Sequence, residues 1–166
     1  MAQHHATTAD ADIMLRLFEL KRDPELKKAR NFCVLEFWPR TVDDVLRAIP
    51  AFATPENNNL RQVIAFWEMA ASFVLRGALH EDLFLDSAGE MFFLWAKFRP
   101  FIKEVRERLT AHELMVCVEK LIAANPASLE RVAKLEKRIA EKVATMQAAA
   151  DPGGSGRYQT VLSRPA

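Results

Sequence analysis

One carboxylate, that of Glu68, lies inside the most apolar long run of the chain, residues 57–77. If this run packs as a helix, Glu68 loses hydration, and burial without a partner would raise its pKa or destabilise the fold. An arginine is therefore expected beside it, and Arg61 and Arg76 share its helix face, two turns away on either side. Such a pair either fixes the register of packed helices or marks a binding site.

The binding interpretation is a small polar ligand in a pocket lined by Glu68, Arg76 and Arg99, with Trp67 and Trp95 as walls. The structural interpretation is a buried ion pair. We favour the structural interpretation, because perturbed charged groups mark functional sites in only a part of cases. Ligand binding at these five residues remains an alternative.

A second pattern is the pair of Arg106 and His112, which five residues separate. The spacing resembles the Arg-x(4-6)-His motif of the HEPN-type helical ribonucleases, which need no metal. Histidine can act as a general acid or base near neutral pH, and arginine can hold a phosphate. However, such a spacing is expected by chance in a chain with many arginines, and Glu107 would repel phosphate. Catalysis by Arg106 and His112 is therefore a weaker alternative.

No residue pattern predicts a metal site or a cofactor. His4 and His5 near the N-terminus provide two ligands, fewer than a metal site needs. The sequence contains neither Cys-x-x-Cys-His nor Glu-x-x-His, so we expect no haem and no di-metal centre. Cys33 and Cys117 lie in apolar runs and are expected to be reduced core residues.

The composition is that of one ordinary globular domain. The chain has 166 residues, half of them apolar, and a domain of this size buries about 70% of its unfolded surface. Lysine and arginine total 23 against 22 aspartates and glutamates, so no overall field attracts nucleic acid. We expect no nucleic-acid partner.

Start and stop signals predict a single all-α domain at residues 8–150, followed by a flexible tail at 151–166. Its six or seven helices should pack around a central helix at about 55–77. Helices are expected to begin at three caps followed by proline, namely Asp23-Pro24, Thr54-Pro55 and Asn125-Pro126. Further helix starts are expected at Thr8, Thr41 and His80, and at a capping box that begins with Thr110. The second helix should run to about Trp38. Gly77 should close the central helix, and Pro100 should kink or divide the helix that contains it.

The last helix carries an apolar stripe against a charged exterior. The stripe consists of Leu129, Val132, Leu135, Ile139, Val143 and Met146. We expect this helix to dock on its own domain, while a homo-oligomer or a protein partner bound through residues 127–146 is the weaker interpretation.

Neither a membrane span nor a secretory signal is expected. Spanning a bilayer takes roughly 20 predominantly apolar residues, and Glu68 interrupts the best candidate run. The first twelve residues lack the basic and apolar regions of a signal peptide. A cytoplasmic location is the resulting expectation.

Several short motifs resemble those of an uncharacterised bacterial all-helical family, a domain of unknown function. They are Trp67-Glu68, Arg76-Gly77, Trp95, Arg99-Pro100 and Arg106, within the segments 23–32, 66–79 and 94–108. The resemblance covers roughly residues 15–108 and implies no activity. Some members of that family carry an N-terminal membrane helix, which we do not expect in this chain.

The absence of a catalytic pattern and the long charged last helix together favour a non-enzymatic function. The leading hypothesis is a helical module that self-associates or binds a protein partner through an amphipathic surface.

Overall fold

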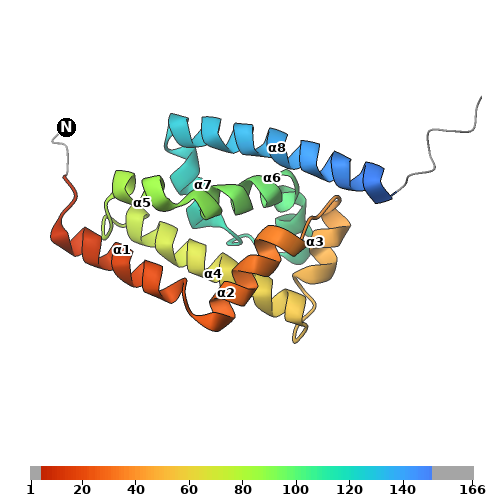
Figure 1. The fold of residues 1–166 in the computed structure, drawn as a ribbon, viewed down its shortest axis with the longest axis horizontal. Helices are drawn as coiled ribbons and strands as arrows, with labels where there is room; N and C mark the ends of the chain where they lie inside the picture. Colours follow the sequence, from red (N-terminus) through yellow and green to blue (C-terminus); the bar gives the residue numbers. More distant parts are fainter. Residues whose placement is uncertain (1–4, 151–166) are drawn as a thin grey trace, which may run out of the picture.

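The computed structural model describes residues 5–150, and every regular element in that part of the chain is a helix (Figure 1). The elements are α1 (Thr8–Leu20), α2 (Pro24–Asn31), the π-helix η1 (Phe32–Glu36), α3 (Val42–Ala48), α4 (Pro55–Leu75), α5 (Glu81–Ser87), α6 (Gly89–Leu109), α7 (Val116–Ala123) and α8 (Pro126–Ala150). The predicted all-α, single-domain fold is confirmed. The predicted tail at 151–166 and His4 lie outside the described residues.

Most helix starts follow the predicted caps. The Asp23 carboxylate accepts hydrogen bonds from the backbone amides of Glu25 and Leu26, both at 3.0 Å, and Pro24 is the first residue of α2. Thr54 likewise accepts a hydrogen bond from the third residue of α4. Gly77 follows the end of α4 with a φ of 71°, a conformation that glycine adopts without strain.

The second helix differs from its prediction. A regular helix was expected to about Trp38, but the chain changes to the π-helix η1 at Phe32, and Phe37 is already extended. The amide of Phe37 bonds to the carbonyl of Phe32 at 2.9 Å, which is the i to i+5 spacing of a π turn. The prediction of a regular α-helix is therefore wrong beyond Asn31.

The predicted capping box at Thr110 is also wrong. Thr110 has a left-handed backbone with a φ of 52° and closes α6, and α7 begins only at Val116. Residues 110–115 form a loop because the first amides of α7 are satisfied by a side chain from another helix, as described below. Pro100 does not divide α6, which runs as one helix from Gly89 to Leu109.

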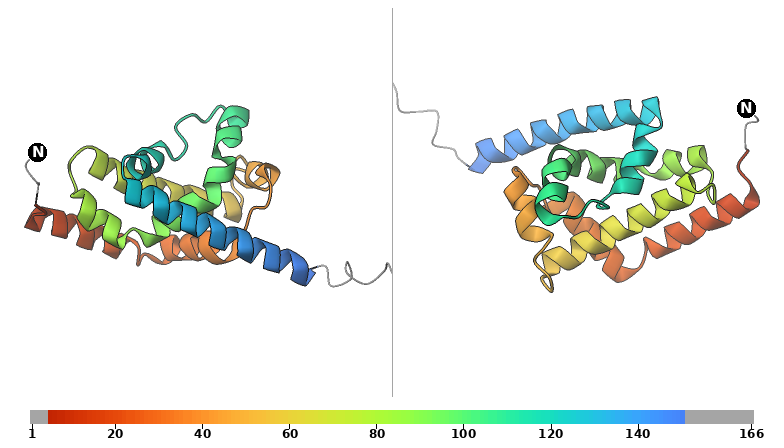
Figure 2. Two further views of the ribbon diagram at one scale, coloured as in Figure 1. Left: turned by 90° about the horizontal axis from the view of Figure 1, so that it is seen from above. Right: turned by 180° about the vertical axis from the view of Figure 1, so that it is seen from behind.

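Helices α4 and α6 carry most of the core between α1 and α8, which lie along opposite long edges of the domain (Figures 1 and 2). Helix α6 is the more enclosed, since every residue from Leu94 to Phe98 is buried. Helix α4 packs on α7 and α2 and leaves one face in solvent. The predicted polar line of α4 forms much of that face, where Arg61 and Arg76 are exposed.

Helix α8 docks on α6 and α7, as predicted. Its Val132 is fully buried, whereas Leu129, which was expected to face inward, is exposed. Both cysteines are free thiols, as predicted, although only Cys33 is fully buried. Each helix between residues 5 and 150 is too short or too polar to cross a membrane.

Candidate functional site

Glu68 caps a helix instead of pairing with an arginine. Its carboxylate accepts hydrogen bonds from the backbone amides of Cys117 at 3.1 Å and Val118 at 2.9 Å, in the first turn of α7. The first amides of a helix have no partner within the helix, and the positive end of its dipole favours an anion. No ion pair involves Glu68 among the residues that the structure describes. The expected arginine partner is therefore replaced by backbone amides.

The other residues of the predicted ligand pocket are used in separate places. Arg99 pairs with Glu136 of α8 at 3.1 Å, and Arg76 is exposed at the end of α4. Trp67 and Trp95 are both buried in the core. The five side chains of the predicted ligand site therefore lie in four different environments of the fold.

A charged cluster that the sequence did not indicate joins α2, α4 and α6. Arg30 of α2 donates to both carboxylate oxygens of Glu90 in α6, with Nε at 2.8 and 2.9 Å. The indole Nε1 of Trp67 donates to the same carboxylate at 3.2 Å. Lys21 stacks over the Trp67 ring, and burial lowers its pKa while Glu90 raises it. The opposite charges of this cluster pair with one another, and their contacts link the three helices.

Lys97 is the most deeply buried charged group of the described residues, with 2% of its surface exposed. Its ammonium donates to the backbone carbonyls of Cys33 and Phe37, both at 2.8 Å, and to that of Val34 at 3.1 Å. The ammonium also lies 3.7 Å from the centroid of the Trp38 ring. These contacts satisfy all three donors of the ammonium.

Burial lowers the pKa of Lys97 to about 8, and the nearby Cys33 thiol acts in the opposite direction. Burial also raises the pKa of Cys33 to about 12, so this thiol stays protonated and unreactive at neutral pH. One signal for Lys97 was present in the sequence, since it lies within the aromatic run at 91–98 as Glu68 lies within its own. Its carbonyl partners depend on η1, which no local pattern indicated.

The two residues of the ribonuclease alternative lie in different settings. Arg106 donates to the carbonyl of Leu114 through Nε and Nη2, at 2.9 and 2.7 Å, and to Glu119 through Nη1 at 2.6 Å. His112 is exposed in the loop between α6 and α7 rather than at a helix start. Arg106 thus stabilises that loop, and its guanidinium donates to protein groups rather than facing solvent, where a phosphate could bind.

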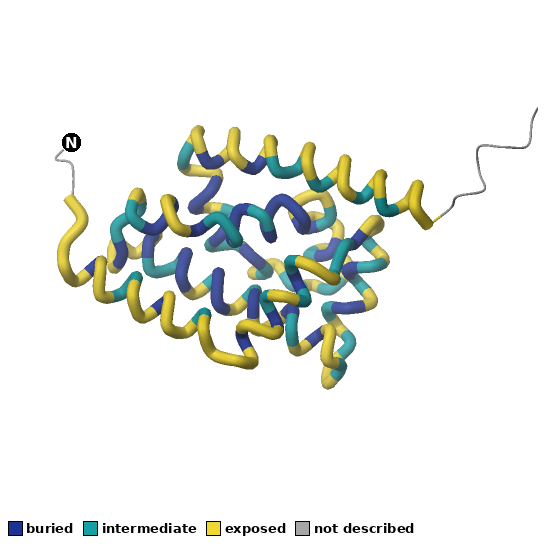
Figure 3. The backbone as a smooth tube through the Cα atoms, in the orientation of Figure 1, coloured by how far each residue is buried: buried dark blue, intermediate teal, exposed yellow. Residues whose placement is uncertain are grey.

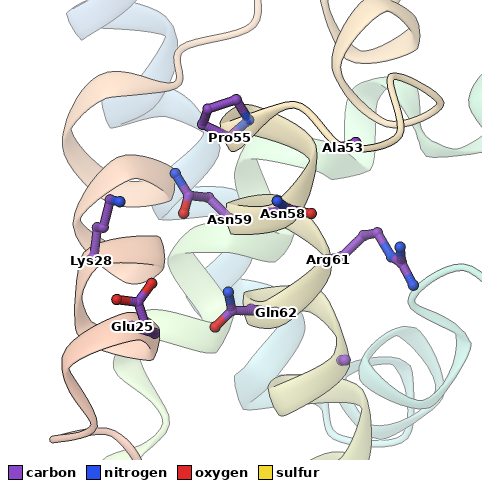
Figure 4. Close-up of a pocket in the computed structure, with 9 residues that line it drawn as sticks. Glu25, Lys28, Ala53, Pro55, Asn58, Asn59, Arg61 and Gln62 are labelled. Carbon is purple, nitrogen blue, oxygen red and sulfur yellow. The ribbon is translucent and has the colours of Figure 1, made fainter.

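An open groove of about 530 Å³ lies beside the first turns of α4. Figure 4 shows Glu25 and Lys28 of α2 facing Asn59 and Gln62 of α4, while Arg61 lies on the far side of that helix. Ala53, Pro55, Asn58 and Ala65 complete the lining. Small-molecule sites are mostly apolar and enclosed, whereas this groove is polar and its lining is largely exposed. Within residues 5–150, no three metal-ligating side chains come together.

The exposed apolar side chains are concentrated on α1. Leu15, Phe18 and Leu20 are exposed to 64%, 54% and 50%, and only Asp10 and Leu17 of this helix are buried (Figure 3). Individual exposed apolar residues are normal, but neighbouring ones on an edge helix indicate an interaction surface. The sequence analysis did not identify this surface, because the apolar residues of this helix do not show by their type which of them the other helices cover.

The comparisons with known proteins agree with the predicted resemblance. No curated protein and no solved structure matches this chain. The model of one family, described as "Domain of unknown function (DUF4760)", matches residues 6–124, which include α1 to α7 but not α8. The chain therefore belongs to the DUF4760 family of domains of unknown function.

Proposed function

We propose that this protein is a non-enzymatic protein-interaction module that binds its partner through α1. The observation that carries the proposal is the exposed pair of Leu15 and Phe18 on this edge helix. The two side chains lie three residues apart and therefore on one side of the helix, where more than half of each remains exposed although the Lys21 ammonium lies over the Phe18 ring. An exposed face of this kind is how amphipathic helices bind protein partners.

The placement of the charged residues supports a non-enzymatic role. Glu68 binds helix amides, Lys97 binds helix carbonyls, and Arg106 binds a loop carbonyl. These three charges thus stabilise backbone groups that would otherwise lack a partner. Residues arranged in this way contribute to the fold and are not directed at a common reacting centre.

The test is affinity capture with the full chain from cells that express it naturally, followed by quantitative mass spectrometry. The double variant Leu15→Ser, Phe18→Ser should lose at least one protein that the wild type retains. Leu35→Ser in η1 is the matched control, because Leu35 is also an exposed leucine and lies on neither α1 nor α8. If both variants retain the same proteins as the wild type, α1 is not the interaction surface.

The predicted interaction through helix 127–146 is a second proposal for the same function. The fold buries only Val132 of this stripe completely and leaves Leu129 exposed. The remaining apolar residues of that stripe, Leu135, Ile139, Val143 and Met146, are half-buried. Helix α1 therefore offers more uncovered apolar surface, and we rank it first.

The enzyme and ligand alternatives keep their own tests. An RNA cleavage assay of the wild type beside His112→Ala tests the ribonuclease, and no wild-type cleavage would end it. A thermal-shift screen with polar metabolites tests ligand binding at Glu68, Arg76 and Arg99. The cytoplasmic location and the bacterial source are likewise predictions.

A further inference from the structure

We infer that the partner of α1 is the α1 helix of a second copy of this chain, packed antiparallel about a two-fold axis between Leu15 and Phe18. This inference rests on the proposed function and names its partner. An isologous interface requires a surface that is complementary to itself. The sequence of α1 meets that requirement in its apolar residues and in its charges.

The apolar centre of the surface is symmetric. The exposed residues Ala11, Leu15 and Phe18 follow one another at helical spacing along the outer face of α1, and the exposed Arg22 lies just beyond the end of this helix. In an antiparallel pair centred between residues 16 and 17, Leu15 of one copy lies opposite Phe18 of the other. Both large apolar side chains of each copy then become covered.

The inner face of α1 packs against its own domain, so only the outer face is available to a partner. Leu17 is buried against the domain, and the Asp10 carboxylate accepts a hydrogen bond from the backbone amide of His80 at 2.8 Å. These contacts hold α1 along the edge of the domain, where no other element covers its outer face (Figures 1 and 3). A second domain can approach that face without displacing α1.

The exposed charges favour a second copy in the antiparallel orientation. In that arrangement Asp12 lies near Arg22 of the other copy. Symmetry repeats this pair, so two opposite-charge contacts flank the apolar centre. A parallel pair would instead bring the two copies of Arg22 together on the same face, which is unfavourable.

The size of the surface sets the expected strength. A helix of 13 residues is about 20 Å long, and its outer face buries less than the roughly 800 Å² per partner of a standard interface. A weak dimer with a dissociation constant of roughly 10–100 μM is therefore expected.

Sedimentation equilibrium of the full chain between about 1 μM and 1 mM tests the dimer, in about 50 mM salt where surface charges act at longer range. The wild type should pass from monomer to dimer. Phe18→Asp should remain monomeric throughout, because each new carboxylate would be buried against Leu15 of the other copy without a partner. Leu35→Asp, at an exposed leucine outside α1 and α8, should dimerise like the wild type. A wild type that is monomeric at 1 mM overturns the inference.

Charge reversal tests the orientation. Asp12→Arg alone and Arg22→Asp alone should each weaken the dimer about tenfold, because each turns two attractive contacts into repulsive ones. The double variant Asp12→Arg, Arg22→Asp should recover most of the wild-type affinity. If the single variants weaken the dimer and the double variant does not recover, the antiparallel pairing is wrong.

The two proposals fail differently. A monomeric wild type whose captured proteins are lost with Leu15→Ser, Phe18→Ser overturns the dimer and keeps α1 as a surface for another protein. A monomeric wild type whose captured proteins are unchanged in that variant overturns both. Circular dichroism of each variant confirms that the helices have formed.

Discussion

Helix α7 and the π-helix η1 each have one end bound by a charged side chain from another helix. At the start of α7 the carboxylate of Glu68 accepts from two amides, and at the end of η1 the ammonium of Lys97 donates to three carbonyls. The signs match the polarity of helix ends, since amides at the start attract an anion and carbonyls at the end attract a cation. The fold thus uses long-range caps where local ones are missing.

The difference between the two ends is their exposure to water. Glu68 is half-buried and can keep part of its hydration, whereas Lys97 has lost nearly all of it. The loss of stability is larger when a backbone group loses its hydrogen-bond partner at a place that water cannot reach. The two caps should therefore differ in their contribution to stability, and the following predictions measure that difference from the largest effect to the smallest.

Replacing Lys97 should have the largest effect. Lys97→Met keeps the aliphatic length but leaves the carbonyls of residues 33, 34 and 37 without a donor, which should lower the free energy of unfolding by about 3–4 kcal/mol. Urea denaturation followed by circular dichroism measures it. Lys103→Met, at an exposed lysine of the same helix, is the control and should change stability by less than about 0.5 kcal/mol. Equal losses of stability in Lys97→Met and Lys103→Met would contradict the prediction that the buried lysine contributes more than the exposed one.

The pH dependence of Lys97 gives the second effect. Its folded pKa of about 8 lies below the usual lysine value of 10.5, so between these pH values the unfolded chain binds more protons than the folded chain. The stability of the wild type relative to Lys97→Met should therefore rise from pH 8 to pH 10.5, by at most about 3 kcal/mol. The carbonyl bonds favour the ammonium and reduce this gain.

Denaturation of both proteins in parallel across that range measures the difference. The raised pKa of Cys33 acts in the opposite direction above pH 9, but it is present in both proteins and largely cancels. A difference that stays constant with pH would show that Lys97 keeps an ordinary pKa despite its burial.

Glu68→Gln should have a smaller effect, a loss of about 1 kcal/mol. The amide oxygen can still accept one hydrogen bond, but the charge that interacts with the start of α7 is gone. Native-state hydrogen exchange should show the loss mainly in α7. Glu113→Gln in the preceding loop, whose side chain is exposed, is the control. Uniform loss of protection in every helix would mean that Glu68 acts on the whole fold rather than on α7.

Arg99→Ala should have the smallest effect, about 0.5 kcal/mol or less. Its ion pair with Glu136 is partly exposed, and surface pairs contribute little. The measured effect should shrink further in high salt, because salt screens such pairs. A loss above about 2 kcal/mol that salt does not change would point to an additional role of Arg99, as the ligand-site alternative requires.

The sequence-based predictions are accurate for interactions between residues close together in the chain and less accurate for interactions between distant ones. Asp23-Pro24 and Thr54-Pro55 start helices as predicted, because a cap depends on residues at most three positions away. Glu68 was identified as a charge that must find a partner, but its partner lies 49 residues away, and the sequence gives no sign of which chemical group it is. The capping pattern at Thr110 failed because Glu68 performs the function that this pattern was expected to perform.

Lys97 and the outer face of α1 were missed for different reasons. The carbonyls that bind Lys97 are 60 to 64 residues away and are available only because η1 is not a regular α-helix. On α1, Leu15 and Leu17 are alike in type, and only the packing of the other helices decides which of them is covered.

The π-helix has a consequence for the tolerance of the chain to changes in length. A π turn contains one residue more than an α turn, and such a turn can arise by insertion of one residue into a regular helix. Deleting one residue between Phe32 and Glu36 would let the segment revert to an α-helix, in which each carbonyl is directed at an amide of the same helix. The ammonium of Lys97 would then lose the carbonyl partners that η1 provides. A one-residue deletion here should therefore disrupt the domain more severely than the removal of a loop residue such as Ala111.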